Sequence, residues 1–416
     1  MMSTMTVLGA AAKEAARFLA LRSEEEKNAA LTAMASRLEA DMETLLEANQ
    51  MDLEAGKQNG LTDSLLDRLA LNPDRIRGMA DGMRDVCRLP DPVGEIDYDT
   101  TRPNGLHIQR VRVPIGVIGI IYEARPNVTA DAAALCLKAG NAVILRGGKE
   151  AIRSNRAIAA SMRAALAQAG FPEDCVALVQ DTSRDTATEM MRCNQYLDLL
   201  IPRGGAGLIR AVVEQATVPV IETGVGNCHI YVDRAADLDM AAKIVFNAKT
   251  SRPSVCNACE SLLVHRDVAE RFLPLVKSLL DEKGVELRGC ERTRAILGEC
   301  VTPATDEDYA TEFLGYVLSV KVVDSLEEAI EHIARYSSGH SECIVTEDAQ
   351  AADAFLRAVD STAVYVNAST RFTDGGEFGF GAEIGISTQK LHARGPMGLR
   401  ELTTTKYLIH GNGQIR

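Results

Sequence analysis

Two hydrophobic patterns follow one another along the chain. Up to about Val93, apolar residues recur at spacings of three and four, as Leu31, Met34 and Leu38 do within residues 24–46, and this pattern predicts amphipathic helices. From Pro114 onward, short runs of consecutive apolar residues alternate with helical stretches. Continuous apolar strands joined by helices are typical of a parallel sheet covered on both faces. We therefore predict a helical N-terminal part followed by α/β structure.

The α/β part contains two series of elements, divided near Asn227. The first series has predicted strands at 117–121, 142–145, 176–179, 197–201 and 218–221, and helices at 129–138, 152–169, 186–192 and 208–215. The second has predicted strands at 230–232, 261–264, 317–323, 343–345 and 363–366. Ligands in open parallel sheets bind at the carboxyl ends of the strands. The residues that follow each strand are therefore the first places to look for chemistry.

Two further strands are predicted away from these series. Residues 90–105 are interrupted by proline and glycine and mark a boundary, and residues 106–113 then alternate apolar and polar positions as an exposed strand does. The tail, residues 402–409, is also strand-like. We expect these two isolated strands to pair with each other across a subunit contact.

Composition narrows the class of protein. A length of 416 residues predicts two or three domains, and a net charge of −13 argues against nucleic acid or an anionic membrane as partner. No apolar run is long enough to span a bilayer, and the charged start of the chain is unlike a signal peptide. The ten cysteines are scattered, which favours reduced thiols and a cytoplasmic protein.

One cysteine stands out because of its local sequence. Cys256 falls in a turn-rich break, residues 251–260, between a predicted helix at 239–249 and a predicted strand at 261–265. A thiol on a connection can be activated as a nucleophile, whereas most cysteines are buried and inert. Cys259 completes a Cys-x-x-Cys, so a thioredoxin-like dithiol and a structural module with a bystander thiol both remain open. A zinc site is disfavoured, because no second such pair or paired histidines lie nearby.

Glycines and charged residues follow several of the predicted strands. Arg146, Gly147 and Lys149 follow one strand, and Gly204 and Gly205 follow another. Such glycines let backbone N–H groups approach a phosphate, and the helix that follows favours negative charge. Neither stretch matches the full G-x-G-x-x-G fingerprint, so ordinary turns remain an alternative to a nucleotide site. A third strand end carries the carboxylate of Glu222.

Longer motifs give a family resemblance. Residues 113–117 and 122–129, together with the positions of Arg146, Glu222, Cys256 and the Glu312-Phe313 pair, resemble the aldehyde dehydrogenase superfamily. Within it, the chain resembles the gamma-glutamyl phosphate reductase family, and nearly the whole chain is covered. The segments more typical of that family are 201–205, 255–258, 329–333, 336–342 and 392–398.

The resemblance implies a fold and its domains. The fold is aldehyde dehydrogenase-like α/β, with two parallel-sheet domains and a small oligomerisation β-flap. Residues 1–98 and 114–227 would form an NADPH-binding domain with its helical N-terminal part, and residues 228–400 a catalytic domain. Residues 99–113 and 401–416 would supply the oligomerisation strands of a homo-oligomer.

The resemblance also implies roles for particular residues. Cys256 corresponds to the nucleophile and Asn127 to the oxyanion asparagine. Glu222 is either catalytic or a polar group beside the nicotinamide. Cys259 is expected to be a spectator, because one thiol suffices for a thioester. No metal is implied. The cofactor-binding positions are Arg146, Gly147, Lys149, Gly204, Gly205, Glu312 and Phe313, and the substrate-binding candidates are Arg125, Arg252 and His340.

The activity implied by this family is a reduction. NADPH would reduce L-glutamyl 5-phosphate to L-glutamate 5-semialdehyde and phosphate through a Cys256 thioester, as the second step of proline biosynthesis from glutamate. The alternative is another cysteine-dependent NAD(P) aldehyde dehydrogenase with a different acyl substrate. Functional coupling to glutamate 5-kinase, which makes the unstable acyl phosphate, is a further expectation.

Overall fold

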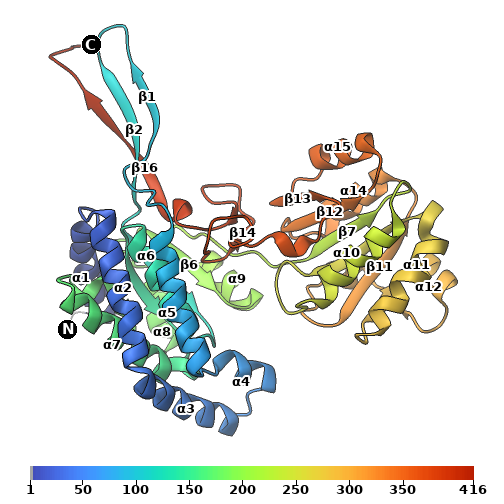
Figure 1. Cartoon of the computed structure of the whole chain (residues 1–416), viewed down its shortest axis with the longest axis horizontal. Coiled ribbons are helices and arrows are strands. Elements are labelled where there is room, and N and C mark those ends of the chain that lie inside the picture. Colours follow the sequence, from blue (N-terminus) through green and yellow to red (C-terminus); the bar gives the residue numbers. More distant parts are fainter. Residues whose placement is uncertain (1–2) are drawn as a thin grey trace. The chain divides into compact units, whose positions relative to one another are not determined.

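The structure consists of two compact units (Figure 1). It is a computed structural model that describes residues 3–416, apart from the side chain of Ser64. Unit 1 comprises the chain up to Thr223 together with Gly379–Gly385 and Met397–Arg416, and unit 2 comprises Gly224–Phe378 and Ile386–Pro396. Among the described residues, no helix has the length and apolar character needed to cross a membrane.

The N-terminal part of unit 1 is helical, as its periodicity predicts. Ser23 and Glu26 form a capping box at the start of α2, and Pro73 occupies the first turn of α5. The periodic stretch at 24–46 is shared by two helices, because Asp41 ends one helix and begins the next with a backbone outside the helical region. The helices are α1 (Thr4–Leu19), α2 (Glu24–Ala40), α3 (Met42–Gln58), α4 (Asp63–Leu69) and α5 (Pro73–Arg88).

A four-stranded parallel sheet forms the centre of unit 1, in the order β5-β4-β3-β6. Every residue of β3 is buried, as its uninterrupted apolar sequence predicts. Helices connect the strands, and short 3-10 turns, η1 (Lys149–Ala151) and η2 (Glu173–Cys175), stand before α7 and β5. The elements are β3 (Val117–Tyr122), α6 (Asn127–Lys138), β4 (Ala142–Arg146), α7 (Ile152–Gln168), β5 (Val176–Leu178), α8 (Arg184–Met191), β6 (Leu199–Arg203) and α9 (Ala206–Gln215).

The strand predicted at 218–221 is wrong. This segment makes one isolated bridge, between Leu200 and Val220, beside β6. Pro219 has no N–H to donate, so a regular ladder cannot continue through it.

A second sheet in unit 1 joins segments that are distant in sequence. Its antiparallel order is β1-β2-β16, formed by β1 (Ile96–Thr101), β2 (His107–Pro114) and β16 (Thr403–His410). Figure 1 shows these strands as a slender extension from unit 1. The two isolated strands pair with each other, as predicted, but β2 and β16 do so within one chain and not across a subunit contact. The turn η4 (Arg400–Leu402) leads into β16.

Unit 2 is built on a seven-stranded parallel sheet with the order β10-β9-β11-β8-β7-β12-β13. Helices cover both faces, and successive residues of β8 alternate between the two cores: Leu262 and Val264 pack with α10 and α11, whereas Leu263 packs with α14 and α15. The α/β fold with parallel sheets is therefore confirmed. The strands are β7 (Cys228–Val232), β8 (Cys259–His265), β9 (Glu286–Gly289), β10 (Thr302–Pro303), β11 (Val317–Val323), β12 (Ser341–Val345) and β13 (Ala363–Val366). The helices are α10 (Leu238–Thr250), α11 (Arg266–Asp281), α12 (Glu291–Leu297), α13 (Asp306–Tyr309), α14 (Leu326–Tyr336) and α15 (Ala349–Ala358). A 3-10 turn, η3 (Thr370–Phe372), follows β13, and a short hairpin, β14 (Ile386–Ser387) with β15 (Gly395–Pro396), completes the unit.

Candidate active site

Cys256 lies on the connection between α10 and β8, as predicted, and we call residues 251–258 the cysteine loop. Its thiol belongs to a half-buried residue in a turn. The loop stands at the amino end of β8, and Glu312 and His340 likewise precede β11 and β12.

The backbone of Cys256 is packed directly against Gly226. A Cβ built on Gly226 would lie 1.6 Å from the Cys256 carbonyl oxygen and 2.3 Å from its Cα. The same carbonyl oxygen accepts a hydrogen bond from Cys228 Sγ at 3.2 Å. A glycine at 226 is thus required by the position of the cysteine loop, and two independent contacts fix the backbone that carries the thiol.

The far side of the cysteine loop is tied to η3. Asn257 Nδ2 donates to Thr373 O at 2.9 Å, and Thr370 Oγ1 donates to Asn257 O at 2.8 Å. Arg371 donates from Nη1 to Asn257 Oδ1 and from Nε to Ser251 Oγ at 3.2 Å. Sequence reasoning missed Arg371, although it lies in the loop after a predicted strand and carries a charge.

Glu312 is held next to Gly226 by a hydrogen bond. Glu312 Oε1 accepts from Gly226 N at 2.9 Å, and burial raises the pKa of Glu312. The adjoining Phe313 has the Arg288 guanidinium over its ring at 5.1 Å. Both members of the predicted Glu-Phe pair therefore stand in unit 2 with fixed positions.

A buried ion pair connects this Glu-Phe segment with both ends of the cysteine loop. Lys249 Nζ and Glu260 Oε2 are 2.5 Å apart, and neither side chain is exposed. Glu260 Oε1 also accepts from Leu314 N at 3.2 Å, where the Leu314 backbone has a φ of 54°. Burial raises the pKa of Glu260 to about 7, against the attraction of Lys249. Nothing in the sequence marks these two charged residues as partners.

His340 is placed differently from its predicted role in substrate binding. Its ring is fully buried, and burial lowers its pKa to about 4. Its Nδ1 lies 2.8 Å from Ser341 Oγ, which in turn bonds Thr373 Oγ1 at 2.6 Å. Because Thr373 O also accepts from Asn257, His340 is linked to the cysteine loop through buried hydrogen bonds. This burial argues against direct contact with a substrate.

The second cysteine of the Cys-x-x-Cys is the first residue of β8. Cys259 is fully buried, and burial raises the pKa of its thiol well above the usual range. No disulfide joins Cys256 and Cys259. A buried thiol of raised pKa is a poor nucleophile, so the structure favours Cys256 for chemistry.

In unit 1, the turn after β3 presents polar side chains at the start of α6. Arg125 and Asn127 are both exposed, and Asn127 is the first residue of the helix. Asn127 Nδ2 donates to Asp131 Oδ2 at 2.9 Å, one turn further along. This bond orients the amide of Asn127 and uses one of its two N–H protons.

The glycines at the strand ends of unit 1 are needed for packing between protein groups. A Cβ on Gly147 would lie 2.1 Å from Asn155 Nδ2, and one on Gly204 would lie 2.5 Å from Glu123 Oε2. That same carboxylate accepts from Gly205 N at 2.9 Å. The N–H of Gly205, ahead of α9, is thus already used by the protein itself.

Two basic residues, Arg146 and Lys149, lie at the end of β4 and shortly after it. Arg146 Nη2 donates to Thr182 O at 2.7 Å and to Ser183 O at 3.2 Å, whereas its buried Nε has no partner among the described residues. Lys149 is exposed in η1. Glu222, the remaining predicted residue of unit 1, is half-buried just past the bridge to β6.

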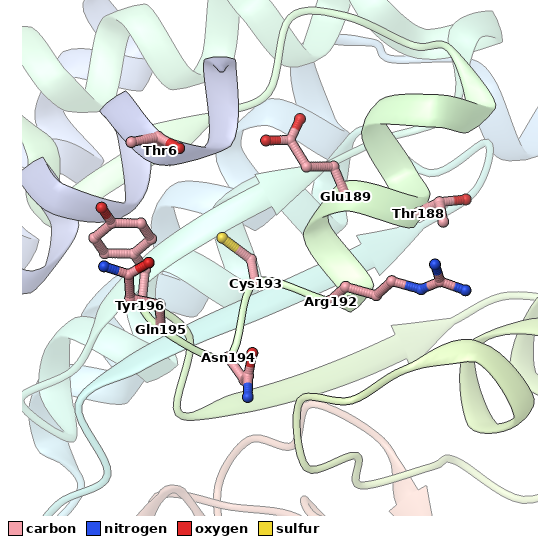
Figure 2. Close-up of a pocket in the computed structure, with 8 residues that line it drawn as sticks. All are labelled: Thr6, Thr188, Glu189, Arg192, Cys193, Asn194, Gln195 and Tyr196. Atoms are coloured by element: carbon pink, nitrogen blue, oxygen red, sulfur yellow. The ribbon is translucent and has the colours of Figure 1, made fainter. Parts of the chain in front are cut away.

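Unit 1 has a surface hollow of about 430 Å³, and none of the predicted site residues lines it (Figure 2). The hollow is lined by residues of α1 and α8 and by residues 192–196, which precede the amino end of β6. The predicted cofactor-binding residues Gly204 and Gly205 follow the opposite, carboxyl end of β6. Figure 2 shows Cys193 between Tyr196 and Glu189. Burial and the Glu189 carboxylate raise the pKa of the Cys193 thiol, so this cysteine is not activated.

Comparisons with known proteins agree with this arrangement. The model of the "Aldehyde dehydrogenase family" matches residues 5–286 and 300–408. A gamma-glutamyl phosphate reductase of Heliobacterium modesticaldum is 63% identical over 414 residues, which cover 100% of this chain and 99% of the relative. A gamma-glutamyl phosphate reductase of Moorella thermoacetica is 64% identical over 408 residues, which cover 98% of this chain and 97% of the relative. The crystal structure of gamma-glutamyl phosphate reductase from Thermotoga maritima is 51% identical, with a TM-score of 0.98 and 100% of each chain covered. The fold, the cysteine loop and these full-length similarities together show that the chain belongs to the gamma-glutamyl phosphate reductases of the aldehyde dehydrogenase family.

Proposed function

We propose that this chain reduces L-glutamyl 5-phosphate to L-glutamate 5-semialdehyde and phosphate, the second step of proline biosynthesis from glutamate. The observation that carries the proposal is the cysteine loop, which places the half-buried Cys256 on a connection between α10 and β8 and fixes its backbone by two contacts. The full-length identity to relatives of that name supports the same substrate.

The chemistry assigned to Cys256 is acyl transfer. Its thiolate attacks the acyl carbon of the substrate, the bond from that carbon to the phosphate oxygen breaks, and a thioester forms. A donor to the tetrahedral oxyanion contributes about 3 kcal/mol in other acyl-transfer sites. We assign Asn127 this role from its place in the family motif, and its bond to Asp131 leaves one amide proton for it.

The cofactor of this proposal is a nicotinamide dinucleotide, specifically NADPH. When bound, it supplies the hydride that reduces the thioester. Two basic residues suit its 2′-phosphate by charge: the half-buried Arg146 ends β4, and Lys149 is exposed three positions further on. Gly147 and Gly204 would contribute through their backbones, and Gly205, whose N–H bonds Glu123, would contribute only by its lack of a side chain. Glu312 and Phe313 would meet the nicotinamide ribose.

Three other assignments complete the proposed site. Glu222 acts as a polar group on the nicotinamide side, because a base that activated water would hydrolyse the thioester. Arg125 and Arg252 are the candidates for the amino-acid end of the substrate. His340 is buried, and so we revise its role to holding η3 and the cysteine loop in position.

The assembly and location remain part of this proposal. We retain an NADPH-binding domain at 1–98 and 114–227, a catalytic domain at 228–400, and oligomerisation strands at 99–113 and 401–416. The proposal also includes assembly into a homo-oligomer, functional coupling to glutamate 5-kinase and a cytoplasmic location.

The reverse reaction tests the function. Purified protein is mixed with glutamate-5-semialdehyde, phosphate and NADP⁺, and the absorbance of the reduced nicotinamide is followed. We expect phosphate-dependent activity that Cys256→Ala abolishes and Cys259→Ala largely retains. Activity that needs no phosphate, or that favours a simple aldehyde, would favour the alternative acyl substrate, and equal loss in both variants would indicate a dithiol.

A further inference from the structure

We propose that Arg371 forms the subsite for the phosphoryl group, which it binds as the leaving group of the acyl phosphate and as inorganic phosphate in the reverse direction. The inference rests on the proposed function, because it identifies which residue of the same site receives the phosphate. It starts from the placement of a cation that no family motif in the sequence pointed to.

The guanidinium of Arg371 is fastened to the cysteine loop at two points. Nη1 donates to Asn257 Oδ1, on the residue that follows Cys256, and Nε donates to Ser251 Oγ, on the residue that precedes Arg252. The backbone of η3 is fastened as well, because Asn257 Nδ2 donates to Arg371 O at 3.2 Å. The position of this cation therefore follows the position of the nucleophile.

The charge of Arg371 is not compensated by an ion pair. Exposed arginines of unit 2 such as Arg335 and Arg357 pair with carboxylates, whereas neither Arg371 nor Arg252 has such a partner within the described residues. Burial lowers the pKa of Arg371, the charge of Arg252 lowers it further, and the carboxylate of Asp374 offsets part of this. Two like charges held together beside a thiol favour an anion between or near them.

The substrate has two anionic ends, and the geometry separates them. Its phosphate is bonded to the carbon that Cys256 attacks, whereas its α-carboxylate is at the far end of the glutamyl chain. Arg371 is anchored through the neighbour of Cys256, so it suits the phosphate, and Arg252 remains the candidate for the amino-acid end. The bonds described for Arg371 use Nε and one proton of Nη1, which leaves its Nη2 protons for phosphate oxygens.

The step that Arg371 assists is balanced without another reactant. In the biosynthetic direction the Cys256 thiolate supplies the electron pair for the new S–C bond, and the electron pair of the broken C–O bond leaves with the phosphate. The negative charge thus moves from sulfur to phosphate. A guanidinium fixed beside both positions stabilises this movement of charge, and the reverse step returns the charge to the thiolate.

Steady-state kinetics in the reverse direction test the proposal with inorganic phosphate as the probe. In Arg371→Gln we expect the KM for phosphate to rise at least about tenfold, as for the loss of hydrogen bonds to a charged group, while the KM for glutamate-5-semialdehyde changes little. Arg371→Lys should recover part of the loss. Arg357→Gln, which removes an exposed arginine of the same unit, is the matched control and should behave as wild type. An unchanged KM for phosphate, or an equal rise in both KM values, would overturn the proposal.

Alkylation of Cys256 gives a readout that does not depend on turnover. Inorganic phosphate should protect Cys256 from iodoacetamide in the wild-type protein and in Arg357→Gln, and should fail to do so in Arg371→Gln. If Arg371 only held the loop, Arg371→Gln would change the alkylation rate without phosphate and keep the protection, and the proposal would be withdrawn. If the wild type showed protection but no phosphate-dependent reduction of NADP⁺, the subsite would stand and the proposed function would fail.

Discussion

Replacing Gly226 by alanine tests whether the backbone contact described above controls the nucleophile. The added methyl group would lie 1.6 Å from the carbonyl oxygen of Cys256, and an ordinary contact of this kind begins at 3.4 Å. The two backbones must therefore separate by about 1.8 Å, since neither partner is a flexible side chain. Gly226 N would also lose its alignment with Glu312 Oε1, now 2.9 Å away.

The size of the effect follows from this displacement. A misplacement of about 1 Å in a reacting group can cost on the order of 10²-fold in rate, and overpacking typically costs about 1–3 kcal/mol of stability. We expect kcat/KM in the reverse reaction to fall by about 10²-fold or more, with a protein that still unfolds cooperatively at a lower Tm.

The assay combines kinetics, thermal unfolding and the rate of alkylation of Cys256 by iodoacetamide. The matched control is Gly78→Ala, in an exposed part of α5 where an added Cβ meets nothing within 4 Å. That variant should keep full activity and gain about 0.5–1 kcal/mol, because alanine is the better helix former. Wild-type kcat/KM and an unchanged alkylation rate in Gly226→Ala would refute the reasoning.

Three other substitutions test separate parts of the structure. Arg146→Ala should lower kcat/KM for NADPH by about tenfold or more and leave that for NADH nearly unchanged, and an equal loss with both cofactors would contradict the assignment. The folded-state pKa of His340 is lowered to about 4 from 6.5, so the unfolded chain binds more protons below pH 6.5, and stability is lost as the pH falls toward 4. His340→Asn should remove about 3 kcal/mol of this pH dependence in chemical denaturation, and an unchanged slope would contradict it. Glu260→Gln leaves the charge of Lys249 buried without its carboxylate and should cost about 3–5 kcal/mol, part of which a second change, Lys249→Met, should restore.

Local patterns predicted most elements of the fold because each strand is a short apolar run and each helix keeps its period. The failures occur where a single residue decides the outcome. Asp41 divides one periodic stretch into α2 and α3, and Pro219 reduces a strand-like run to one bridge. The pairing of β2 with β16 was predicted although the two strands are far apart in the sequence, but its occurrence within one chain was not, since no pattern distinguishes pairing within a chain from pairing between chains.

A site residue could be predicted only where its neighbours in the sequence distinguish it. Cys256 could be found from its turn-rich surroundings, but Arg371 could not, because its contact with the cysteine loop depends on how the chain returns after β13. Lys249 and Glu260 have charges that usually indicate solvent, and only the fold shows them as a buried pair. For the same reason the burial of His340 could not be read from a motif.

The sheet β1-β2-β16 has a consequence for the order in which the molecule can form. Its middle strand, β2, is synthesised before β16, and the whole of unit 2 is made between them. Until β16 has been synthesised, β2 has an open hydrogen-bonding edge, and Asn141 Nδ2 lacks its acceptor, Leu402 O, 2.8 Å away in the finished structure, until that residue has been made. Unit 1 therefore reaches its native form only after unit 2 and β16 have been made, and a nascent chain stalled before Thr403 presents a strand edge to any other chain nearby.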